Sequence, residues 1–414
     1  MKTHQLRQPH CRLCGAPLSH TFIDLGLSPL ANALVSPDNI GRGEFFSPLH
    51  VWICDRCFLV QIEEIEAPAE LFGEYRYFSS YSTSWLQHAE KFAGAMIARF
   101  GLDEGKRVVE IASNDGYLLQ YFASRGIPTL GIEPARNIAE IARERGVPTR
   151  EMFFGAEAAA SQLREGYAAD LMPANNVLAH VPDLIDFLEG FRILLKPEGV
   201  ATFEFPHLLR LIEERQFDTI YHEHFSYLSL SVVCEALRRC GLRAFDVEEL
   251  PTHGGSLRVF ACRAEAGYSE SGAVADLLDK ERAFGLLKMN GYDGFSESAA
   301  RIKYDSLEFL IRARRDGKTV CGYAVAAKGA TFLNYCGIGP EFVQVVADRS
   351  PYKQGCWLPG CRIPIVAPEA LIALRPDYVL ILAWNLKREI ASELDAIRAW
   401  GGKFVTAIPQ LEIF

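Results

Sequence analysis

The densest group of reactive side chains in this 414-residue chain lies between Thr219 and Tyr227, in the sequence TIYHEHFSY. Two histidines, a glutamate and two tyrosines fall within this short stretch. Each buried polar group needs a hydrogen-bond partner, so this density is unusual for a segment that only fills a core. Neutral histidine is a suitable general base near neutral pH. The segment therefore indicates an enzyme that moves a proton.

Length and composition set the frame for this segment. A chain of 414 residues is too long for one ordinary core, which predicts two or three domains. The net charge of -9 argues against a general nucleic-acid surface. The longest apolar run, Tyr378 to Trp384, is far shorter than a membrane span, and the N-terminus lacks the apolar core of a signal peptide. A cytoplasmic protein that binds neither nucleic acid nor membrane is expected, with a monomer as the working assumption.

Two Cys-x-x-Cys pairs occur near the N-terminus, Cys11 with Cys14 and Cys54 with Cys57. Two such pairs can deliver four thiolates to one tetrahedral Zn²⁺. Cysteines of a cytoplasmic chain indicate metal ligands or buried thiols rather than disulfides, and four free thiols are the alternative. With sulfur at all four positions no site is open for substrate, so the metal should be structural. Residues 25–32 (LGLSPLAN) are expected to form an irregular loop around it.

Strands alternate with helices between residues 74 and 264, which predicts a doubly wound α/β sheet. A helix is expected at 84–100, and strands are expected at 107–112, 129–132 and 171–178. The polar turn 113–116 follows the first strand, and Glu133 follows the second. In such sheets ligands bind outside the carboxyl ends of the strands. These turns are therefore where a ligand is expected.

The residues of these turns favour one kind of ligand. A carboxylate such as Glu133 can accept hydrogen bonds from both hydroxyls of a ribose. The first turn is glycine-poor, so it lacks the close backbone approach that a pyrophosphate needs. This disfavours NAD and favours a nucleoside without phosphates, such as S-adenosylmethionine; an α/β nucleotide domain with another ligand is the alternative. The expected cofactor-binding residues are Glu110, Ala112, Asn114, Asp115, Glu133, Pro134, Asn175 and Tyr77.

The C-terminal part predicts a second, Rossmann-like α/β unit. Strands are expected at 318–327, 343–348, 378–383 and 404–408. Lys328 and Gly329 follow the first of these strands at the start of a helix, a suitable seat for phosphate. Lys353 lies in a second basic loop after the next strand. Solvated loop charges are the alternative, but two such loops favour a diphosphate site.

Several long motifs in a fixed order are more specific than any one of them. They are CRLCG with DLGLSPLAN and CDRC, then EIASNDGYLL, YHEHFSY, and GYAVAAKGATFLNYCG with ADRSPYKQG. On these motifs the chain resembles, over essentially its whole length, the sugar C-methyltransferases that act on nucleotide-linked 4-keto-deoxysugars. The resemblance implies a zinc-binding domain at 1–73, a central S-adenosylmethionine-dependent methyltransferase domain at 74–285, and a C-terminal α/β domain at 286–414 that helps bind the sugar nucleotide. One departure is Ala324, where a glycine is expected after Tyr323.

The resemblance also implies that His224 is the catalytic base, with Tyr221 and Glu223 beside it. A carbon next to a ketone becomes nucleophilic when it loses a proton, and the resulting enolate can accept a methyl group. Glu223 is expected to orient His224 and to stabilise its imidazolium. The candidate donors to the developing oxyanion are His180, His222 and Tyr221. His222 is also expected to contact the substrate, although a bond to backbone at the edge of the site is the alternative.

The expected function is methyl transfer from S-adenosylmethionine to C3 of a nucleotide-linked 4-keto-6-deoxysugar, with Zn²⁺ as a structural ion. The first rival is an O- or N-methyltransferase on the same scaffold. A non-catalytic, zinc-anchored nucleotide-binding protein is a second, and a dehydrogenase is disfavoured by the glycine-poor first turn. The polar segment 77–82 (YFSSYS) could close over the cofactor or cap the helix that follows.

Overall fold

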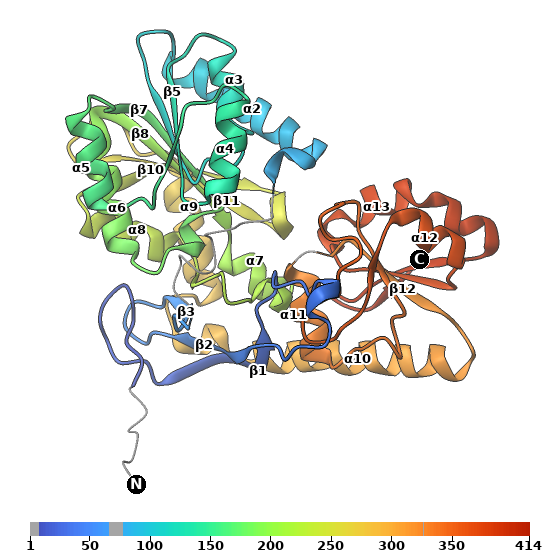
Figure 1. The fold of residues 1–414 in the computed structure, drawn as a ribbon. Coiled ribbons are helices and arrows are strands. Elements are labelled where there is room, and N and C mark those ends of the chain that lie inside the picture. Colours follow the sequence, from blue (N-terminus) through green and yellow to red (C-terminus); the bar gives the residue numbers. More distant parts are fainter. Residues whose placement is uncertain (1–7, 66–77, 326) are drawn as a thin grey trace.

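The computed structural model describes residues 8–65, 78–325 and 327–414, and these residues form three separate sheets (Figure 1). An N-terminal sheet has four strands, a central sheet seven and a C-terminal sheet six. The predicted α/β architecture in three parts is therefore confirmed, while the divisions after residues 73 and 285 stay predictions. Tyr77 lies outside the described residues. Within the described ranges, no helix is long and apolar enough to cross a membrane.

The N-terminal sheet is antiparallel and includes a strand from far along the chain. Its order is β1 (His20–Pro29), β2 (Phe46–Ile53), β3 (Val60–Ile62) and β9 (Ser226–Tyr227). The end of TIYHEHFSY is therefore part of this sheet. The loop predicted at 25–32 is wrong up to Pro29, because β1 continues through a register shift at Gly26, whose φ of 76° interrupts the strand pattern.

The central sheet has the predicted doubly wound layout, with order β10-β11-β8-β7-β4-β5-β6. Strands β4 to β8 run parallel, and β11 is antiparallel to both its neighbours. The strands are β4 (Val108–Ile111), β5 (Thr129–Glu133), β6 (Thr149–Glu151), β7 (Ala169–Asn175), β8 (Leu195–Pro206), β10 (Leu242–Leu250) and β11 (Ser256–Arg263). The strand predicted to reach residue 178 ends at Asn175, since Asn176 adopts a left-handed φ of 54°.

Helices cover both faces of the central sheet (Figure 1). Ser82 caps the first of them by accepting a hydrogen bond from the Trp85 amide at 3.2 Å, so the predicted capping role is confirmed. The helices are α2 (Thr83–Phe100), α3 (Leu119–Ala123), α4 (Arg136–Glu144), α5 (Ala156–Arg164), α6 (Leu184–Leu194), α8 (Leu230–Arg239) and α9 (Gly272–Phe284).

The C-terminal sheet is parallel except at its last strand, with order β14-β13-β12-β15-β16-β17. Its strands are β12 (Val320–Tyr323), β13 (Val346–Ala347), β14 (Ile365–Val366), β15 (Tyr378–Ile381), β16 (Lys403–Thr406) and β17 (Glu412–Ile413), and its helices are α10 (Phe295–Arg315), α11 (Ala327–Cys336), α12 (Pro368–Leu374) and α13 (Lys387–Glu393). The strand predicted at 318–327 ends at Tyr323, because Ala324 has a left-handed φ of 66°. This is the conformation that glycine adopts without strain.

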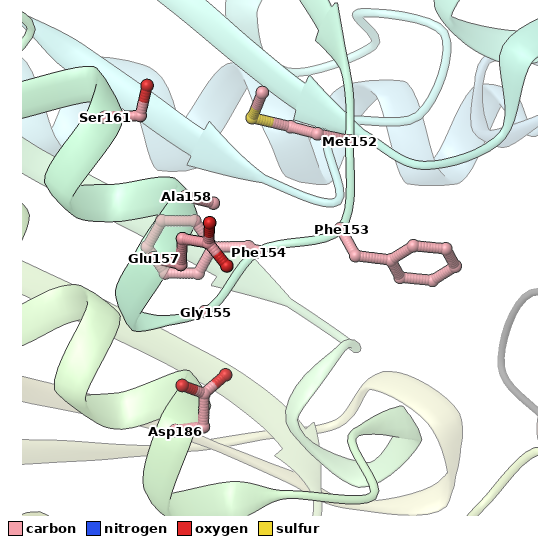
Figure 2. Close-up of a pocket in the computed structure, with 8 residues that line it drawn as sticks. All are labelled: Met152, Phe153, Phe154, Gly155, Glu157, Ala158, Ser161 and Asp186. Atoms are coloured by element: carbon pink, nitrogen blue, oxygen red, sulfur yellow. The ribbon is translucent and has the colours of Figure 1, made fainter.

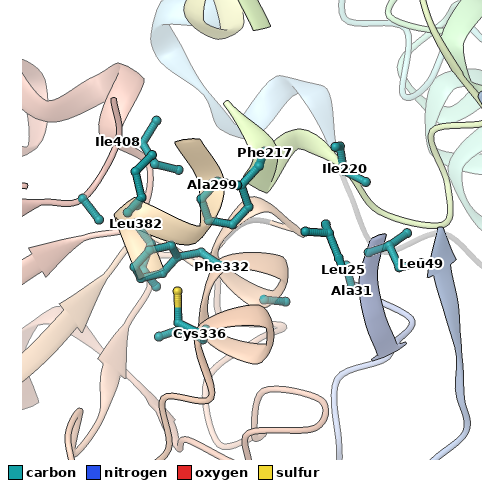
Figure 3. Close-up of a cluster of buried hydrophobic side chains, with 14 of the residues drawn as sticks. Leu25, Ala31, Leu49, Phe217, Ile220, Ala299, Phe332, Cys336, Leu382 and Ile408 are labelled. Carbon is teal, nitrogen blue, oxygen red and sulfur yellow. The ribbon is translucent and has the colours of Figure 1, made fainter. Parts of the chain in front are cut away.

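The three parts meet at an insertion between β8 and α8. It contains α7 (Leu208–Glu213), the 3-10 turn η4 (Phe217–Thr219) and β9. Figure 3 shows one apolar cluster that joins Phe217 and Ile220 of the insertion to Leu25 and Leu49 of the N-terminal sheet and to Phe332 of α11. The hydroxyl of Thr331 on α11 also donates to the Ile220 carbonyl at 2.9 Å. The insertion is thus fixed from two sides.

A buried carboxylate fixes the two ends of the same insertion. Glu281 of α9 accepts from His207 Nε2 at 2.7 Å, just before α7. It also accepts from the backbone amides of Leu230 and Ser231, at 2.6 and 2.9 Å, in the first turn of α8. Negative charge at a helix N-terminus is favourable, and these amides have no partner within the helix. The His207 ring holds the pKa of Glu281 below its ordinary value although burial alone would raise it.

We predict that Glu281→Ala lowers the free energy of unfolding by about 3 kcal/mol, since it leaves a buried histidine and two amides without their acceptor. Glu281→Gln should lower the free energy of unfolding by less, because the amide oxygen of glutamine can still accept a hydrogen bond. Because the pKa of Glu281 is depressed, its contribution is present at neutral pH and is lost as the pH falls through the folded-state pKa. Urea unfolding at neutral and acidic pH measures this, and an Ala variant as stable as wild type would contradict it.

Candidate active site

His224 is held in one tautomer by two hydrogen bonds. Its Nδ1 lies 2.8 Å from the Thr219 carbonyl, which can only accept, so Nδ1 carries the proton. Its Nε2 therefore has the lone pair, and the Tyr221 hydroxyl, 2.7 Å away, donates to it. The orientation of the imidazole is thus set by the backbone of its own segment. The arrangement presents Nε2 as a base.

The pKa of His224 lies well below its ordinary value, mainly because the ring is buried. Nearby positive charge on His180, Lys328 or His253 would add to this shift, and the hydrogen bond to Thr219 opposes it. The ring of His180 packs edge-on against His224, with centroids 4.7 Å apart, and burial lowers the pKa of His180 to about 4. Both rings are therefore neutral at neutral pH. Nε2 of His224 can accept a proton, but it is a weaker base than the predicted histidine with a pKa near the working pH.

The two residues before His224 fasten the segment to the N-terminal part. Glu223 accepts a hydrogen bond from Asn32 at 2.7 Å, so the carboxylate predicted to orient His224 bonds elsewhere and Thr219 does the orienting. His222 Nε2 lies 3.0 Å from the Ser47 hydroxyl and 3.2 Å from the Pro48 carbonyl, both on β2. These bonds are of the kind expected for the alternative, a backbone contact at the edge of the site, and the substrate contact of His222 stays a prediction.

The four predicted metal ligands come together beside this sheet. One sulfur from each of Cys11, Cys14, Cys54 and Cys57 lies within 4.8 Å of all the others. The Cys11–Cys57 and Cys14–Cys54 sulfurs are 3.4 and 3.5 Å apart. Tetrahedral zinc with bonds of about 2.3 Å places sulfurs roughly 3.8 Å apart, so the set fits Zn²⁺ after small adjustments. The site holds the loops that flank β1 and β3.

At the carboxyl ends of β4 and β5, hydrogen bonds connect the two loops that carry the predicted cofactor residues. Glu133 accepts from the backbone amides of Asn114 at 3.0 Å and Ala135 at 2.9 Å. Burial raises the pKa of Glu133 to about 7, against the effect of these bonds. Glu110 on β4 is also buried, and desolvation followed by the charges of Glu133 and Asp115 raises its pKa well above the ordinary value. A site rich in buried carboxyl groups needs a ligand with donors or positive charge.

The first turn is braced by the segment before α2. Ser79 donates its backbone amide to the Asn114 side chain at 2.9 Å, and the Ser80 hydroxyl donates to Asp115. Arg145 Nη1 also donates to Asp115 at 2.8 Å. These serines therefore position the turn, while Ser82 caps the helix.

The turns at the ends of β4 and β7 fit the predicted cofactor by their unused acceptors. The second carboxylate oxygen of Asp115 and the amide oxygen of Asn175 are buried and have no hydrogen-bond partner among the described residues. Buried acceptors of this kind cost free energy unless a ligand satisfies them. Ala112 and Asn114 have φ of 55° and 48°, so the backbone is strained around them, as is common at functional sites. Pro134 follows Glu133 in the same turn. Hydroxyl and amine donors of S-adenosylmethionine are of the kind that these acceptors require.

The three C-terminal residues predicted to bind phosphate have different surroundings. Lys353 bonds to the Val325 carbonyl and lies 3.3 Å from Asp348, so it ties together the loops after β12 and β13. Gly329 is buried where a Cβ would lie 3.0 Å from Leu382, so close packing explains this glycine. Lys328 faces away from this pair, toward the central domain, with its Nζ 3.3 Å from the His253 carbonyl.

Thr219 and Asp218, for which the sequence predicts no role of their own, also belong to this arrangement. Thr219 sets the tautomer of His224, and Asp218 accepts from the indole of Trp384 at 2.8 Å. No sequence signal links Asp218 with Trp384, because they are on different domains. His253, in contrast, precedes a glycine pair, and it adopts a left-handed φ of 54° with its ring 5.4 Å from Trp85.

A hollow of about 450 Å³ lies beside the end of β6 and the start of α5, on the side of the central sheet away from His224 along the strand order. In Figure 2 the ring of Phe153 points away from the other lining residues into open space. Its lining includes none of the residues predicted for catalysis or cofactor binding. The lining residues are Met152, Phe153, Phe154, Gly155, Glu157, Ala158, Ser161 and Asp186.

Comparisons with known proteins identify the family of the chain. Three family models match in sequence: a zinc binding domain at 11–72, a methyltransferase domain at 85–247 and a C-methyltransferase C-terminal domain at 251–409. C-methyltransferase NovU of Streptomyces niveus is 38% identical over 97% of this chain and 95% of its own length. A ubiquinone biosynthesis O-methyltransferase of Aeromonas salmonicida is 32% identical over 34% of this chain and 65% of its own. The solved structure of the mitomycin 7-O-methyltransferase MmcR is 19% identical over 45% of this chain and 56% of that chain, with a TM-score of 0.34.

The central sheet, its carboxylate-rich turns and these matches define an S-adenosylmethionine-dependent methyltransferase. The chain belongs to the C-methyltransferase family. It carries the zinc-binding module of that family, with its four cysteines clustered. The predictions of family, enzyme class, cofactor and zinc are confirmed.

We predict that Cys54→Ser lowers the zinc content of the purified protein well below one ion per chain, because one of four thiolates is lost. The melting temperature and methyl transfer should fall together, since β9 of the active-site segment pairs with β3 of this module. Cys262→Ser is the matched control, as Cys262 is a buried thiol on β11 outside the cluster. Metal analysis by plasma emission measures the zinc, and full zinc in Cys54→Ser would contradict the assignment.

Proposed function

We propose that this enzyme methylates C3 of a nucleotide-linked 4-keto-6-deoxysugar through an enolate, with His224 as the base. One observation carries the proposal: the Thr219 carbonyl fixes the proton on Nδ1 and leaves the lone pair on Nε2 next to the Tyr221 hydroxyl. A hydrogen on carbon beside a ketone needs a neutral base of this kind. Oxygen and nitrogen acceptors are nucleophiles already and need it less.

Tyr221 has two tasks in this scheme. In the structure its hydroxyl donates to Nε2 of His224 at 2.7 Å, where the C3 hydrogen must lie during proton removal. A bound sugar displaces the hydroxyl from Nε2, and the hydroxyl is then free to donate to the ketone oxygen O4. A single donor of this type contributes about 3 kcal/mol in other enzymes. His180, packed against His224 and neutral, is the second candidate donor.

The cofactor site lies at the same edge of the sheet. Bound S-adenosylmethionine supplies an electrophilic methyl group. In our proposal Glu133 accepts from its ribose, and Asp115 and Asn175 use the buried oxygens that no described residue satisfies. Glu110, whose buried carboxyl group has a raised pKa and so holds its proton, borders these residues on β4. Ala112, Asn114 and Pro134 supply the backbone of the turns. The chain after β7 leads from Asn175 to His180 within a few residues, and His180 packs against His224, which connects the cofactor turns to the proposed base.

The substrate class rests on the family and on the C-terminal domain. The printed name of the Streptomyces relative, C-methyltransferase, supports carbon as the acceptor atom. Lys353, fixed by Val325 and Asp348 at the ends of two parallel strands, is the residue that we assign to the diphosphate. The ring of the adjacent Tyr352 stacks on the ring of Tyr81 of the central domain, with centroids 6.2 Å apart. This loop therefore also contacts the segment that braces the cofactor turn.

We predict that His224→Asn loses about 10²- to 10⁴-fold in kcat for methyl transfer with little change in melting temperature. His222→Asn is the matched comparison: it should lower the melting temperature more than kcat, because His222 anchors the segment to β2. The assay uses dTDP-, GDP- and CDP-linked 4-keto-6-deoxysugars with S-adenosylmethionine, followed by NMR of the product. A methyl group on oxygen or nitrogen, or full activity of His224→Asn, would contradict the proposal.

We predict that the affinity for S-adenosylmethionine rises as the pH increases from about 6 to about 8. The pKa of Glu133 is raised to about 7, so its carboxyl gains charge across this window and becomes a better acceptor for the ribose hydroxyls. Glu133→Gln should bind more weakly and lose this pH dependence. Glu140→Gln, an exposed carboxylate on α4, should keep it. Isothermal titration calorimetry at several pH values measures the affinity of wild type and of each variant. A wild-type affinity that does not change with pH would contradict the role of Glu133.

A further inference from the structure

The ammonium group of Lys328 lies at the junction of three elements. Lys328 is in the first turn of α11, and its Nζ lies 3.3 Å from the His253 carbonyl of the central domain. The same Nζ lies 4.8 Å from the ring centroid of Trp384, which gives a cation–π contact. In the described part of the chain no carboxylate lies within salt-bridge distance of this ammonium group. A half-buried ammonium with three donors thus has hydrogen-bonding capacity left for a ligand.

Asp218 supplies the negative charge that this ammonium group faces. It is 1% exposed, and one of its oxygens accepts from the Trp384 indole at 2.8 Å. Its other oxygen has no hydrogen-bond partner among the described residues. Burial raises the pKa of Asp218 to about 6, while Lys328 and Trp384 act to lower it. Burial lowers the pKa of Lys328, and Asp218 opposes this. Trp384 contacts both charged groups and so holds them at a fixed separation.

The same elements hold the catalytic base. Thr219, the residue after Asp218, binds Nδ1 of His224, and Ile220 accepts from Thr331 of α11. Lys328 and His224 are therefore fixed to the same short segment. The charge of Lys328 is near enough to lower the pKa of His224 and of His253. These two histidines and Asp218 are the titratable groups that face it.

A cation at this place would stabilise the negative charge that develops during the proposed reaction. His224 is a weak base, and His180 and His253 have pKa values of about 4, so neither ring is charged at neutral pH. Proton removal would produce an enolate anion in a buried site where these side chains can offer only uncharged hydrogen-bond donors. A fixed positive charge favours that anion and at the same time keeps His224 unprotonated before the reaction. A phosphate seat would not require a position so close to the base.

We propose that Lys328 is a catalytic residue whose ammonium group pairs with the developing enolate oxygen, and that Asp218 is a positioning residue that acts on it through Trp384. The C3–H bond breaks and its proton goes to Nε2 of His224. The bonding pair forms C3=C4, and the carbonyl pair moves to O4, where the negative charge meets Lys328. The inference rests on the proposed function and replaces the phosphate contact predicted for Lys328.

The test measures deuterium uptake at C3 of the three nucleotide-linked 4-keto-6-deoxysugars in D₂O by the full-length enzyme. For the sugar that wild type exchanges, Lys328→Met should lower the rate constant at saturation about 10²- to 10³-fold. Its affinity for the free nucleoside diphosphate should stay within about twofold, because the charge acts on O4. Lys353→Met is the matched variant and should show the reverse: weaker diphosphate binding with exchange retained at saturation. Lys328→Arg should recover part of the exchange.

The outcomes separate this inference from the proposed function. Exchange by wild type that Lys328→Met retains, with weakened diphosphate binding, would overturn the catalytic role and restore the phosphate seat. No exchange by wild type with any of the three sugars would overturn both proposals. If Lys328→Met does not fold, Asp218→Asn decides. The Asn variant keeps the acceptor for Trp384 but removes the charge that raises the pKa of Lys328, so the alkaline limb of the exchange profile should move to lower pH with KM unchanged. An unmoved limb would overturn the role of Asp218.

Discussion

The active site depends on the fixation of one short segment, Phe217 to Tyr227, by three domains at once. β9 adds it to the N-terminal sheet, and hydrogen bonds from Asn32 and Thr331 hold it from opposite sides. The apolar cluster around Phe217 and Ile220 removes water from the junction. A catalytic histidine must keep one tautomer and one direction, which a loop on a single domain would not guarantee. The four-cysteine cluster that would hold zinc lies in the N-terminal module whose β3 pairs with β9, so the metal would stiffen one of these three supports.

Backbone strain and unsatisfied acceptors gather at the strand ends that surround this segment. Left-handed residues follow β4, β7 and β12 at Ala112, Asn176 and Ala324, and His253 adds a fourth near β11. Each costs free energy that the surrounding fold must supply. The buried oxygens of Asp115 and Asn175 add to this cost. This cost in free energy is explained when a ligand binds to the turns.

Much of the fold could be predicted from the sequence, because its signals are local. Apolar runs, the two Cys-x-x-Cys pairs and the acidic residue at the end of β5 gave the three-part α/β architecture, the metal cluster and the cofactor turns. Strand ends were less predictable: β7 and β12 stop early because a non-glycine residue turns left-handed, and no composition rule indicates this. Residues 25–29 resembled a loop because the bulge at Gly26 breaks the alternation of a strand.

The partners within the site could not be predicted, because they depend on tertiary contacts. Adjacent residues in HEH point to different neighbours, so Glu223 and His222 serve the N-terminal sheet while His224 faces His180. The bond from Trp384 to Asp218 and the approach of Lys328 to His253 join residues that lie 166 and 75 positions apart in the sequence. Lys328 at a helix start looked like a phosphate seat. The packing of α11 on the segment instead places its ammonium group beside the His253 carbonyl.

The central claim is that this junction holds His224 as a neutral Nδ1–H base. Nitrogen-15 NMR of the histidine rings, with His224 assigned by comparison with His224→Asn, tests this most directly. We expect Nδ1 to be protonated and Nε2 to be bare between about pH 6 and pH 8, with no titration, because burial depresses the pKa. A His224 ring that titrates near its ordinary value, or that carries its proton on Nε2, would contradict the account.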